Sequence, residues 1–376
     1  MELKISQAEL SKALSFIQSI VERKTTMTIL ANVPLTAEQD GQLKLSATDL
    51  DITAVVKVPA QVTSEGSTTI SAKVFHEVVR ELPDRDVKLS LGEGERLNVA
   101  SGNSQFSIVG VHSEEFPSLP GISIEPSCVI KGQQLLEMVQ KTVYAVSHDE
   151  TRFNLNGVCF ESAKGKGKGG DQLLRLVATD GHRLSLIQRP VDGLEFDGSP
   201  IVPTKGLTEV RKLLDEIGDQ DVKVTLSDGF FVVDTGKAKV SMRLIDGEFP
   251  DYNQVLPKKD GVSISLPVER FAQALKRASL MVTDKGKCIK LDFSTGKLKL
   301  SSSSPELGES HEELELDYKG EHLSIGFNAK YLLDFTSSIS QESNLVLKLS
   351  GELGPAKLHE EHDESYFGIV MPMRLA

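Results

Sequence analysis

The chain of 376 residues carries 54 aspartates and glutamates against 42 lysines and arginines, a formal net charge of −12. This balance argues against a simple nucleic-acid-binding protein, which usually presents a net basic face. Three cysteines without a CxxC pair exclude a disulfide framework and indicate buried free thiols. Because the chain start lacks a signal-peptide pattern and no apolar run approaches the roughly 18 residues of a membrane span, we expect a cytoplasmic protein without a membrane partner.

The first predicted helix covers residues 6–24 and follows a short strand at Leu3–Ile5. Ser6 and Glu9 have the spacing of a capping box, which satisfies backbone donors at a helix start. Apolar residues then recur on one helix face: Leu10, Leu14, Ile17 and Val21.

The same spacing returns twice, each time after a short strand pattern. It recurs at Leu135, Val139, Thr142 and Val146, and again at Phe271, Leu275, Ala278 and Val282. A second helix pattern follows each copy, at 72–82, 204–217 and 328–340, with an alternating strand after it. The chain is therefore a triplication with predicted domains at 1–125, 126–257 and 258–376. We expect an α+β fold in which each repeat has two helices backed by antiparallel sheets.

The predicted helices differ in charge from the rest of the chain. The six segments 6–24, 72–82, 131–146, 204–217, 267–287 and 328–340 hold 16 lysines and arginines against 11 aspartates and glutamates. If all six line one surface, that surface is mildly basic on an acidic body. The alternative is that helices favour lysine and arginine in any case.

Several loops invite a chemical interpretation. The glycine-lysine run Lys164–Gly170 lacks the P-loop pattern, so we interpret it as a hairpin tip whose lysines suit an anionic partner. Ser301–Ser304 is expected to be a polar loop and Glu306–Glu315 a solvated acidic face. The histidines of His359–Asp363 are three residues apart instead of the four of HExxH, which favours a solvated loop over a metal site.

Asp180 and His182 invite a hydrolase interpretation, but no nucleophile motif such as GxSxG accompanies them. The equivalent stretch of the first repeat keeps Thr48 and Asp49 without the histidine and arginine, so the Thr-Asp pair is predicted to form a turn. His182 and Arg183 are particular to the middle repeat and indicate a binding site. The tail Ile369–Leu375, with two methionines and a proline, is expected to pack into a core or to face a partner.

Four motifs carry a family resemblance: ATDGHRL at Ala178–Leu184, DGEFPDY at Asp246–Tyr252, VLP at Val255–Pro257 and VMPMRL at Val370–Leu375. Together with the triplication, they make the chain similar to the bacterial β sliding clamps, the processivity subunits of DNA polymerase III. The resemblance implies a head-to-tail dimeric ring of six domains whose helices face duplex DNA.

The resemblance also implies the function and the partners. The protein is expected to be non-enzymatic, to need no cofactor or metal, and to bind double-stranded DNA independently of sequence as a homodimer. Its expected clients are the replicative DNA polymerase alpha subunit, the clamp loader, other polymerases, ligase and mismatch-repair proteins, which dock through a short peptide motif. The alternatives are a peptide-binding repeat scaffold without DNA and an enzyme that uses Asp180 and His182.

The resemblance places a client-peptide groove between the second and third repeats. The matching residues are Leu155, Thr179, Gly181, His182, Arg183, Leu184, Pro250, Val255, Ile369, Val370, Met371, Pro372, Met373 and Arg374. An apolar groove of this kind accepts the Leu or Phe of an extended peptide, while backbone and arginine groups orient it. Gln254 departs from the family pattern, which often has an arginine there.

DNA contact and ring closure are implied at further positions. The DNA-binding residues by resemblance are Lys24, Lys73, His148, Asp149, Arg152, Phe153 and Asn154. Lys205, Lys212 and Arg277 are added from their places on predicted helices. The dimer interface is expected to set Phe106 against Leu280 and Met281.

Overall fold

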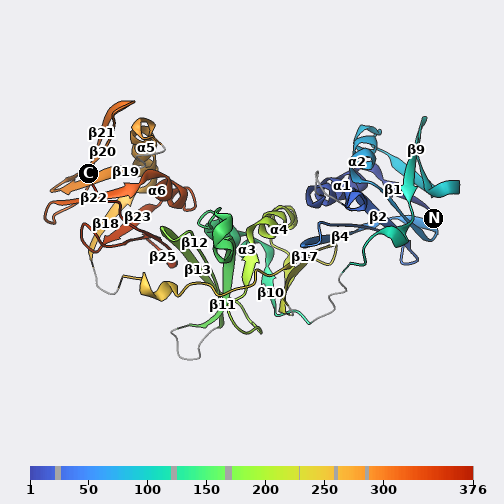
Figure 1. The fold of residues 1–376 in the computed structure, drawn as a ribbon, viewed down its shortest axis with the longest axis horizontal. Helices are drawn as coiled ribbons and strands as arrows, with labels where there is room; N and C mark the ends of the chain where they lie inside the picture. Colours follow the sequence, from blue (N-terminus) through green and yellow to red (C-terminus); the bar gives the residue numbers. More distant parts are fainter. Residues whose placement is uncertain are drawn as a thin grey trace. The chain divides into compact units, whose positions relative to one another are not determined.

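The structure is a computed structural model that describes residues 1–21, 27–119, 125–165, 172–227, 229–257, 261–283 and 288–375 (Figure 1). The chain forms two compact units. Unit 1 comprises Met1–Leu136, Val191–Phe196 and Lys205–Leu244, and unit 2 comprises Glu137–Pro190, Asp197–Thr204 and Ile245–Ala376.

The predicted triplication is confirmed by the order of the elements. The first repeat contains β1 (Glu2–Ser6), α1 (Gln7–Ile20), β2 (Asn32–Glu38), β3 (Gln42–Thr48), β4 (Ile52–Pro59), β5 (Gln61–Ser64), β6 (Gly66–Ser71), α2 (Ala72–Glu81), β7 (Asp86–Leu91), β8 (Arg96–Ser101) and β9 (Ser104–Val111). The second contains β10 (Cys128–Lys131), α3 (Gly132–Val143), β11 (Gly157–Lys164), β12 (Gln172–Thr179), β13 (Arg183–Pro190), β14 (Ile201–Pro203), α4 (Thr204–Ile217), β15 (Asp221–Ser227), β16 (Phe230–Asp234) and β17 (Ala238–Arg243).

The third repeat has the order of the second: β18 (Val262–Pro267), α5 (Val268–Ala278), β19 (Cys288–Ser294), β20 (Lys297–Ser304), β21 (Gly308–Glu315), β22 (Leu323–Asn328), α6 (Ala329–Thr336), β23 (Asn344–Leu349), β24 (Ala356–Glu360) and β25 (Asp363–Val370). Short 3-10 helices are η1 (Thr28–Ala31), η2 (Glu93–Glu95), η3 (Ser113–Glu115), η4 (Glu150–Leu155), η5 (Tyr252–Gln254) and η6 (Ser279–Met281).

The strands of each unit pair antiparallel. Unit 1 has a 13-stranded sheet in the order β10-β15-β16-β17-β4-β3-β2-β6-β9-β8-β7-β1-β5. Unit 2 has an eight-stranded sheet, β14-β11-β12-β13-β25-β24-β23-β18, and a four-stranded sheet, β21-β20-β19-β22. Helix α1 packs on β3 and β4 in unit 1, and α5 packs on β20 and β21 in unit 2.

Two strand pairs join consecutive repeats. In unit 1, β4 of the first repeat pairs with β17 of the second, with Thr53 opposite Ser241. In unit 2, β13 of the second repeat pairs with β25 of the third, with Leu184 opposite Ile369. We call these two pairs the unit 1 seam and the unit 2 seam.

The predicted helix faces are correct, but some helix ends are not. The buried residues of α1 include Leu10, Leu14 and Ile17, whereas Val21 lies beyond its last residue. The capping box is wrong because the Ser6 side chain makes no cap hydrogen bond. Polar Thr142 is tolerated on the buried face of α3 because its hydroxyl donates to the Met138 carbonyl at 2.8 Å.

One predicted loop is a strand, and the predicted solvated acidic face is largely a strand without buried residues. Ser301–Ser304 belongs to β20, and most of the acidic run forms β21, which pairs with β20 along its whole length. His359 lies in β24 and is only 3% exposed, so the solvated-loop interpretation is wrong for this residue. Strands β11 and β12 flank Lys164–Gly170 as predicted, but residues 166–170 lie outside the described part of the chain.

Cys128 and Cys159 are buried and Cys288 is half-buried, and all three are free thiols. Burial raises the pKa of Cys128 to about 11, which keeps it in the thiol form. Among the described residues no helix is long and apolar enough to cross a membrane, and no group of three or more His, Cys, Asp or Glu is arranged to hold a metal.

Candidate functional site

The site begins at a tight turn between β12 and β13. Asp180 Oδ1 accepts hydrogen bonds from the backbone nitrogens of His182 at 2.9 Å and Arg183 at 3.0 Å. Thr179 Oγ1 donates to the Arg183 carbonyl at 2.5 Å and accepts from the Gly181 nitrogen at 3.1 Å. Gly181 has φ 86°, which favours glycine. The predicted structural role of the Thr-Asp pair is therefore confirmed.

The first repeat builds the same turn from a different sequence. Thr48 Oγ1 donates to the Ile52 carbonyl at 2.9 Å, and Asp49 Oδ1 accepts from the nitrogens of Asp51 and Ile52 at 3.0 and 2.6 Å. Leu50 has φ 80° at the position of Gly181. The same turn therefore occurs in both repeats, directly before β4 and directly before β13.

The C-terminal tail of the third repeat lies against this turn. Beyond the β13–β25 pair, the Met371 nitrogen donates to the His182 carbonyl at 2.9 Å, and the Met373 nitrogen donates to the Gly326 carbonyl at 2.8 Å. Ile369 and Val370 are buried, Met371 is exposed, Pro372 and Met373 are half-buried, and Arg374 is exposed. The expectation that the tail packs into a core is therefore confirmed for Ile369 and Val370, and a contact of the exposed Met371 with a partner stays a prediction.

An apolar cluster lies on the strand face beside the unit 2 seam. Its buried members are Cys159, Val177, Leu184, Leu186, Tyr252 and Ile369, with Phe249, Val255, Leu256 and Phe367 packed against it and partly exposed. Three predicted groove residues, Leu184, Val255 and Ile369, meet here. Leu155 and Thr179 are buried at 8% exposure each, and Pro250 is exposed. Partly exposed apolar side chains over a buried floor suit an apolar peptide side chain.

A polar group borders this cluster. Arg175 Nη1 donates to Tyr252 Oη at 3.0 Å and lies 3.5 Å from Glu161 Oε2, and its Nη2 donates to Gln188 Oε1 at 3.1 Å. Tyr252 in turn donates to Glu161 at 2.6 Å, and burial followed by this carboxylate raises the pKa of Tyr252 to about 12. The guanidinium of Arg175 is therefore neutralised within the protein.

Arg183 has every arm of its guanidinium engaged. Nε donates to Asp180 Oδ2 at 3.0 Å, Nη1 to Asp334 Oδ2 at 2.5 Å and Nη2 to the Tyr144 carbonyl at 2.6 Å. Its guanidinium carbon also lies 4.6 Å from the centre of the Tyr331 ring. At 7% exposure, Arg183 fixes the turn and has no arm left to orient a peptide.

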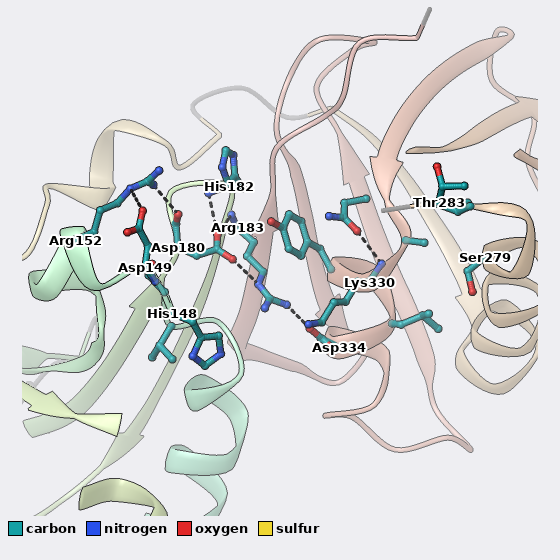
Figure 2. Close-up of a pocket in the computed structure, with 17 residues that line it drawn as sticks. His148, Asp149, Arg152, Asp180, His182, Arg183, Ser279, Thr283, Lys330 and Asp334 are labelled. Carbon is teal, nitrogen blue, oxygen red and sulfur yellow. Dashed lines mark hydrogen bonds and ion pairs between the residues drawn. The ribbon is translucent and has the colours of Figure 1, made fainter. Parts of the chain in front are cut away.

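A cleft of about 630 Å³ opens beside this network in unit 2 (Figure 2). Figure 2 shows one wall formed by the second repeat and the other by the third, with Lys330 and Asp334 of α6 among the residues of the third. The second repeat contributes residues predicted for both peptide and DNA: His148, Asp149, Arg152, His182 and Arg183. The two predicted sites therefore border one another.

Comparison with known proteins decides the family. Family models described as the N-terminal, central and C-terminal domains of the DNA polymerase III beta subunit match residues 1–120, 129–251 and 253–374. The chain belongs to the β sliding clamp family. The Beta sliding clamp of Caulobacter vibrioides (strain NA1000 / CB15N) is 35% identical over 378 residues that span 100% of both chains.

Solved structures agree over the full length. The DNA polymerase sliding clamp from Caulobacter crescentus has a TM-score of 0.91 at 34% identity, and the sliding clamp from Bartonella birtlesii bound to griselimycin has 0.92 at 32%, each covering 100% of both chains. The three repeats are thus three clamp domains, and the chain is a DNA sliding clamp of the DNA polymerase III type.

Asp149, an unexpected neighbour for DNA phosphate, has a local role in this clamp. It caps η4 by accepting from the Thr151 nitrogen at 3.0 Å and from the Thr151 hydroxyl at 2.7 Å. These hydrogen bonds, followed by the charge of Arg152, lower the pKa of Asp149. In the same 3-10 helix, Phe153 is 56% exposed, whereas Asn154 is half-buried and its side-chain amide donates to the Glu248 carbonyl at 3.0 Å.

The predicted DNA-contact cations differ in how free they are. Lys24 lies outside the described residues. Lys73 is exposed, and its nearest carboxylate in the described part of the chain is that of Glu77, at 4.0 Å. By contrast, Lys205 lies 2.6 Å from Asp49 Oδ2 and Lys212 lies 2.9 Å from Glu209 Oε2. Arg277 is held by Glu312 at 2.5 Å.

Of the predicted interface residues, Phe106 lies in an incompletely paired strand, whereas Leu280 and Met281 lie in a 3-10 helix that contacts β20 and β21. Phe106 is 43% exposed in β9, of which only Gly110 and Val111 pair with β6. In unit 2, Leu280 is 68% exposed and Met281 is half-buried, both in η6. Within the described residues β21 pairs with β20 alone.

Two residues of the cleft, Lys330 and Asp334, were not predicted from the sequence. Lys330 is the second residue of α6, as Lys73 is of α2 and Lys205 of α4. Alignment of the repeats would therefore have found it. Asp334 had no comparable signal, because its partner Arg183 is 151 residues away.

Proposed function

We propose that this clamp acts without catalysis, as two protomers closed head to tail around duplex DNA in the cytoplasm, with one domain per repeat at 1–125, 126–257 and 258–376. Polymerases, including the alpha subunit, the clamp loader, ligase and mismatch-repair proteins dock short peptides in the groove at the unit 2 seam. The observation that carries the proposal is the repetition of the seams.

Each seam pairs the third strand after the first helix of one repeat with the last strand of the next repeat. β4 pairs with β17 and β13 pairs with β25. The remaining members of these two strand classes are β21 in the third repeat and β9 in the first. Pairing β21 of one protomer with β9 of the other repeats the seam and closes a two-fold ring.

The register of this third seam follows from equivalent positions. Thr53, Leu184 and Gly308 each lie opposite the last residue of the preceding strand: Thr48, Thr179 and Ser304. Val111, Ile245 and Met373 likewise pair with equivalent residues: Thr69, Ile201 and Gly326. Ser241 lies four residues before Ile245, and Ile369 lies four residues before Met373, so the equivalent residue of β9 is Ser107, four residues before Val111. Because Thr53 pairs with Ser241 and Leu184 with Ile369, Gly308 is expected to pair with Ser107 of the other protomer.

The surface that carries the helices suits a sliding contact with DNA. In unit 1 a hollow of about 800 Å³ lies over α1, α2 and α4, lined by Lys12, Arg80 and Lys212 among other polar residues. Cations that are already paired with carboxylates contact phosphate weakly, and phosphate contact is independent of sequence. A ring held by topology needs no tighter grip.

The groove suits an apolar peptide end. Its floor is the cluster around Leu184 and Ile369, and exposed Met371 stands at its edge. Because Arg183 is fully engaged and Gln254 replaces the common arginine, peptide orientation rests on backbone groups and His182.

The test has two parts. Light scattering across a dilution series should give about twice the 41.0 kDa chain mass. The protein loaded on nicked circular DNA should then stay bound, and it should slide off after the circle is linearised. A stable monomer that still binds a hexapeptide ending in Leu-Phe would overturn the ring and favour the alternative, a peptide-binding scaffold without DNA.

A further inference from the structure

We infer that the unit 1 seam carries a second groove that binds an acidic, extended peptide segment of a partner protein. The groove has a volume of about 610 Å³ and lies entirely in unit 1. The described residues that line it include five lysines and two aspartates, on a chain whose formal net charge is −12. The lysines are Lys44, Lys57, Lys223, Lys237 and Lys239.

The groove is the repeat-equivalent of the peptide groove at the unit 2 seam. The pair Leu184–Ile369 corresponds to Thr53–Ser241, and the pair Leu186–Phe367 corresponds to Val55–Lys239. Thr53, Val55, Lys239 and Ser241 all line the unit 1 groove. The same backbone framework is therefore faced with polar and basic side chains instead of apolar ones.

The positive charge of Lys44 in the unit 1 groove is not neutralised by a carboxylate of the described residues, as the charge of Arg175 is at the equivalent place in unit 2. Arg175 lies opposite Gln188 and Glu161, which both contact its guanidinium. The equivalent of Arg175 is Lys44, which lies opposite Lys57 and Thr36. Two lysines thus replace an arginine and its amide partner, and a threonine replaces the carboxylate.

Most of these lysines lack a close carboxylate. Among the described residues, Lys57 has an ion pair only with Glu38, at 4.0 Å, and Lys44, Lys223 and Lys237 have none. Of the two aspartates, Asp234 is paired with Lys239 at 3.1 Å and Asp221 with Lys131 at 2.9 Å. Like charges directly opposite one another destabilise a strand pair, and a bound anion relieves that repulsion.

The position and lining favour a peptide over nucleic acid. Helix α1 packs on β3 and β4, whose residues Leu45 and Ala54 are buried, whereas Lys44 and Thr53 alternate with them and belong to the opposite face. The DNA of the proposed ring lies on the helical side. None of the described residues lining the groove is aromatic, whereas single-strand binders stack bases on aromatic rings. The choice of a peptide rests on the peptide groove proposed for the equivalent seam.

The probe is a fluorescein-labelled decapeptide of alternating glutamate and serine, measured by fluorescence anisotropy with the full-length protein. We expect saturable binding that weakens as salt is raised, and none for the same peptide with glutamine in place of glutamate. The double variant Lys44→Glu/Lys57→Glu should lower the affinity at least about tenfold. The matched control Lys299→Glu/Lys319→Glu, with the same change in net charge at exposed positions of unit 2, should bind as the unaltered protein does.

If both double variants weaken binding of the acidic peptide equally, the groove is not its binding site, because the binding then responds to net charge alone. Tighter binding of labelled oligothymidylate, lost in Lys44→Glu/Lys57→Glu, would overturn the peptide as the occupant. A hexapeptide ending in Leu-Phe reports separately on the unit 2 groove and should bind both variants equally. If that hexapeptide binds neither the unaltered protein nor the variants while the acidic peptide binds, the proposed client groove is rejected and the proposed basic groove is retained.

Discussion

Arg183 Nη1 donates to Asp334 Oδ2 at 2.5 Å, which ties the turn of the second repeat to helix α6 of the third. The guanidinium is 7% exposed, also holds Asp180 and lies over the Tyr331 ring. Because the turn carries His182, whose carbonyl accepts a hydrogen bond from the Met371 nitrogen, the pair positions one edge of the proposed peptide groove.

Asp334→Asn is expected to leave a buried guanidinium arm with a weaker acceptor. It should lower the free energy of unfolding by about 2 kcal/mol and weaken binding of the Leu-Phe hexapeptide several-fold. Urea unfolding followed by circular dichroism gives the first and anisotropy the second. Lys330→Gln on the same helix should change stability by less than about 0.5 kcal/mol. Equal effects of the two variants would remove the assigned role of Asp334.

The repeated turn predicts that substitutions at its two equivalent positions change the free energy of unfolding in opposite directions. Gly181→Ala places a Cβ at φ 86°, 3.2 Å from Arg152 Nη1, and should destabilise by about 1 kcal/mol. Leu50→Gly relieves φ 80° at a residue that is 52% exposed, and should stabilise by up to about 1 kcal/mol. Leu50→Ala keeps the Cβ and should give no gain. Thermal and urea unfolding test all three, and destabilisation by Leu50→Gly would contradict the strain argument.

The ring register predicts a specific cross-link. Ser107→Cys with Gly308→Cys should form disulfides between protomers under mild oxidation, because residues directly opposite in a sheet meet the Cα spacing of roughly 4.4–6.8 Å. Non-reducing electrophoresis should show a covalent dimer. Gln105→Cys with Gly308→Cys is two residues out of register and should cross-link poorly. A reversed preference would show that the third seam does not repeat the other two.

The ion pairs of Arg189 predict an acid-dependent stability. Arg189 Nη2 lies 2.7 Å from Glu137 Oε1 and 2.8 Å from Asp363 Oδ2. Burial raises the pKa of both carboxyls, but hydrogen bonds outweigh it: those from Arg189 and Lys141 lower the pKa of Glu137, and those from Ser365 and Arg189 lower that of Asp363. Their stabilisation is therefore complete above the ordinary values of 4.5 and 3.8 and is lost as the pH falls through the lowered pKa values.

Arg189→Met should remove this dependence. In urea unfolding over a pH series, its stability deficit against the unaltered protein should be largest near neutral pH and should narrow in acid, below about pH 4. A deficit that stays constant across the series would mean that Arg189 acts through packing alone.

The sequence was most informative where structure follows from local spacing. The helix faces of α1, α3 and α5 and the Thr-Asp turns were predicted because their periodicity and backbone hydrogen bonds involve near neighbours. The end of strand β20 was predicted wrongly because Ser301–Ser304 resembles a loop in composition, and its pairing with β21 outweighs that low propensity.

By itself the sequence determined the triplication, the element order and the family motifs. The tertiary structure decided which charges are free. It engaged Arg183 with Asp334, paired Lys205 with Asp49 and left Lys44 opposite Lys57. It also made two equivalent seams different, one apolar and one basic. The physical reason is that helix and turn geometry depend on residues a few positions apart, whereas the neutralisation of a charge depends on partners that only folding brings together.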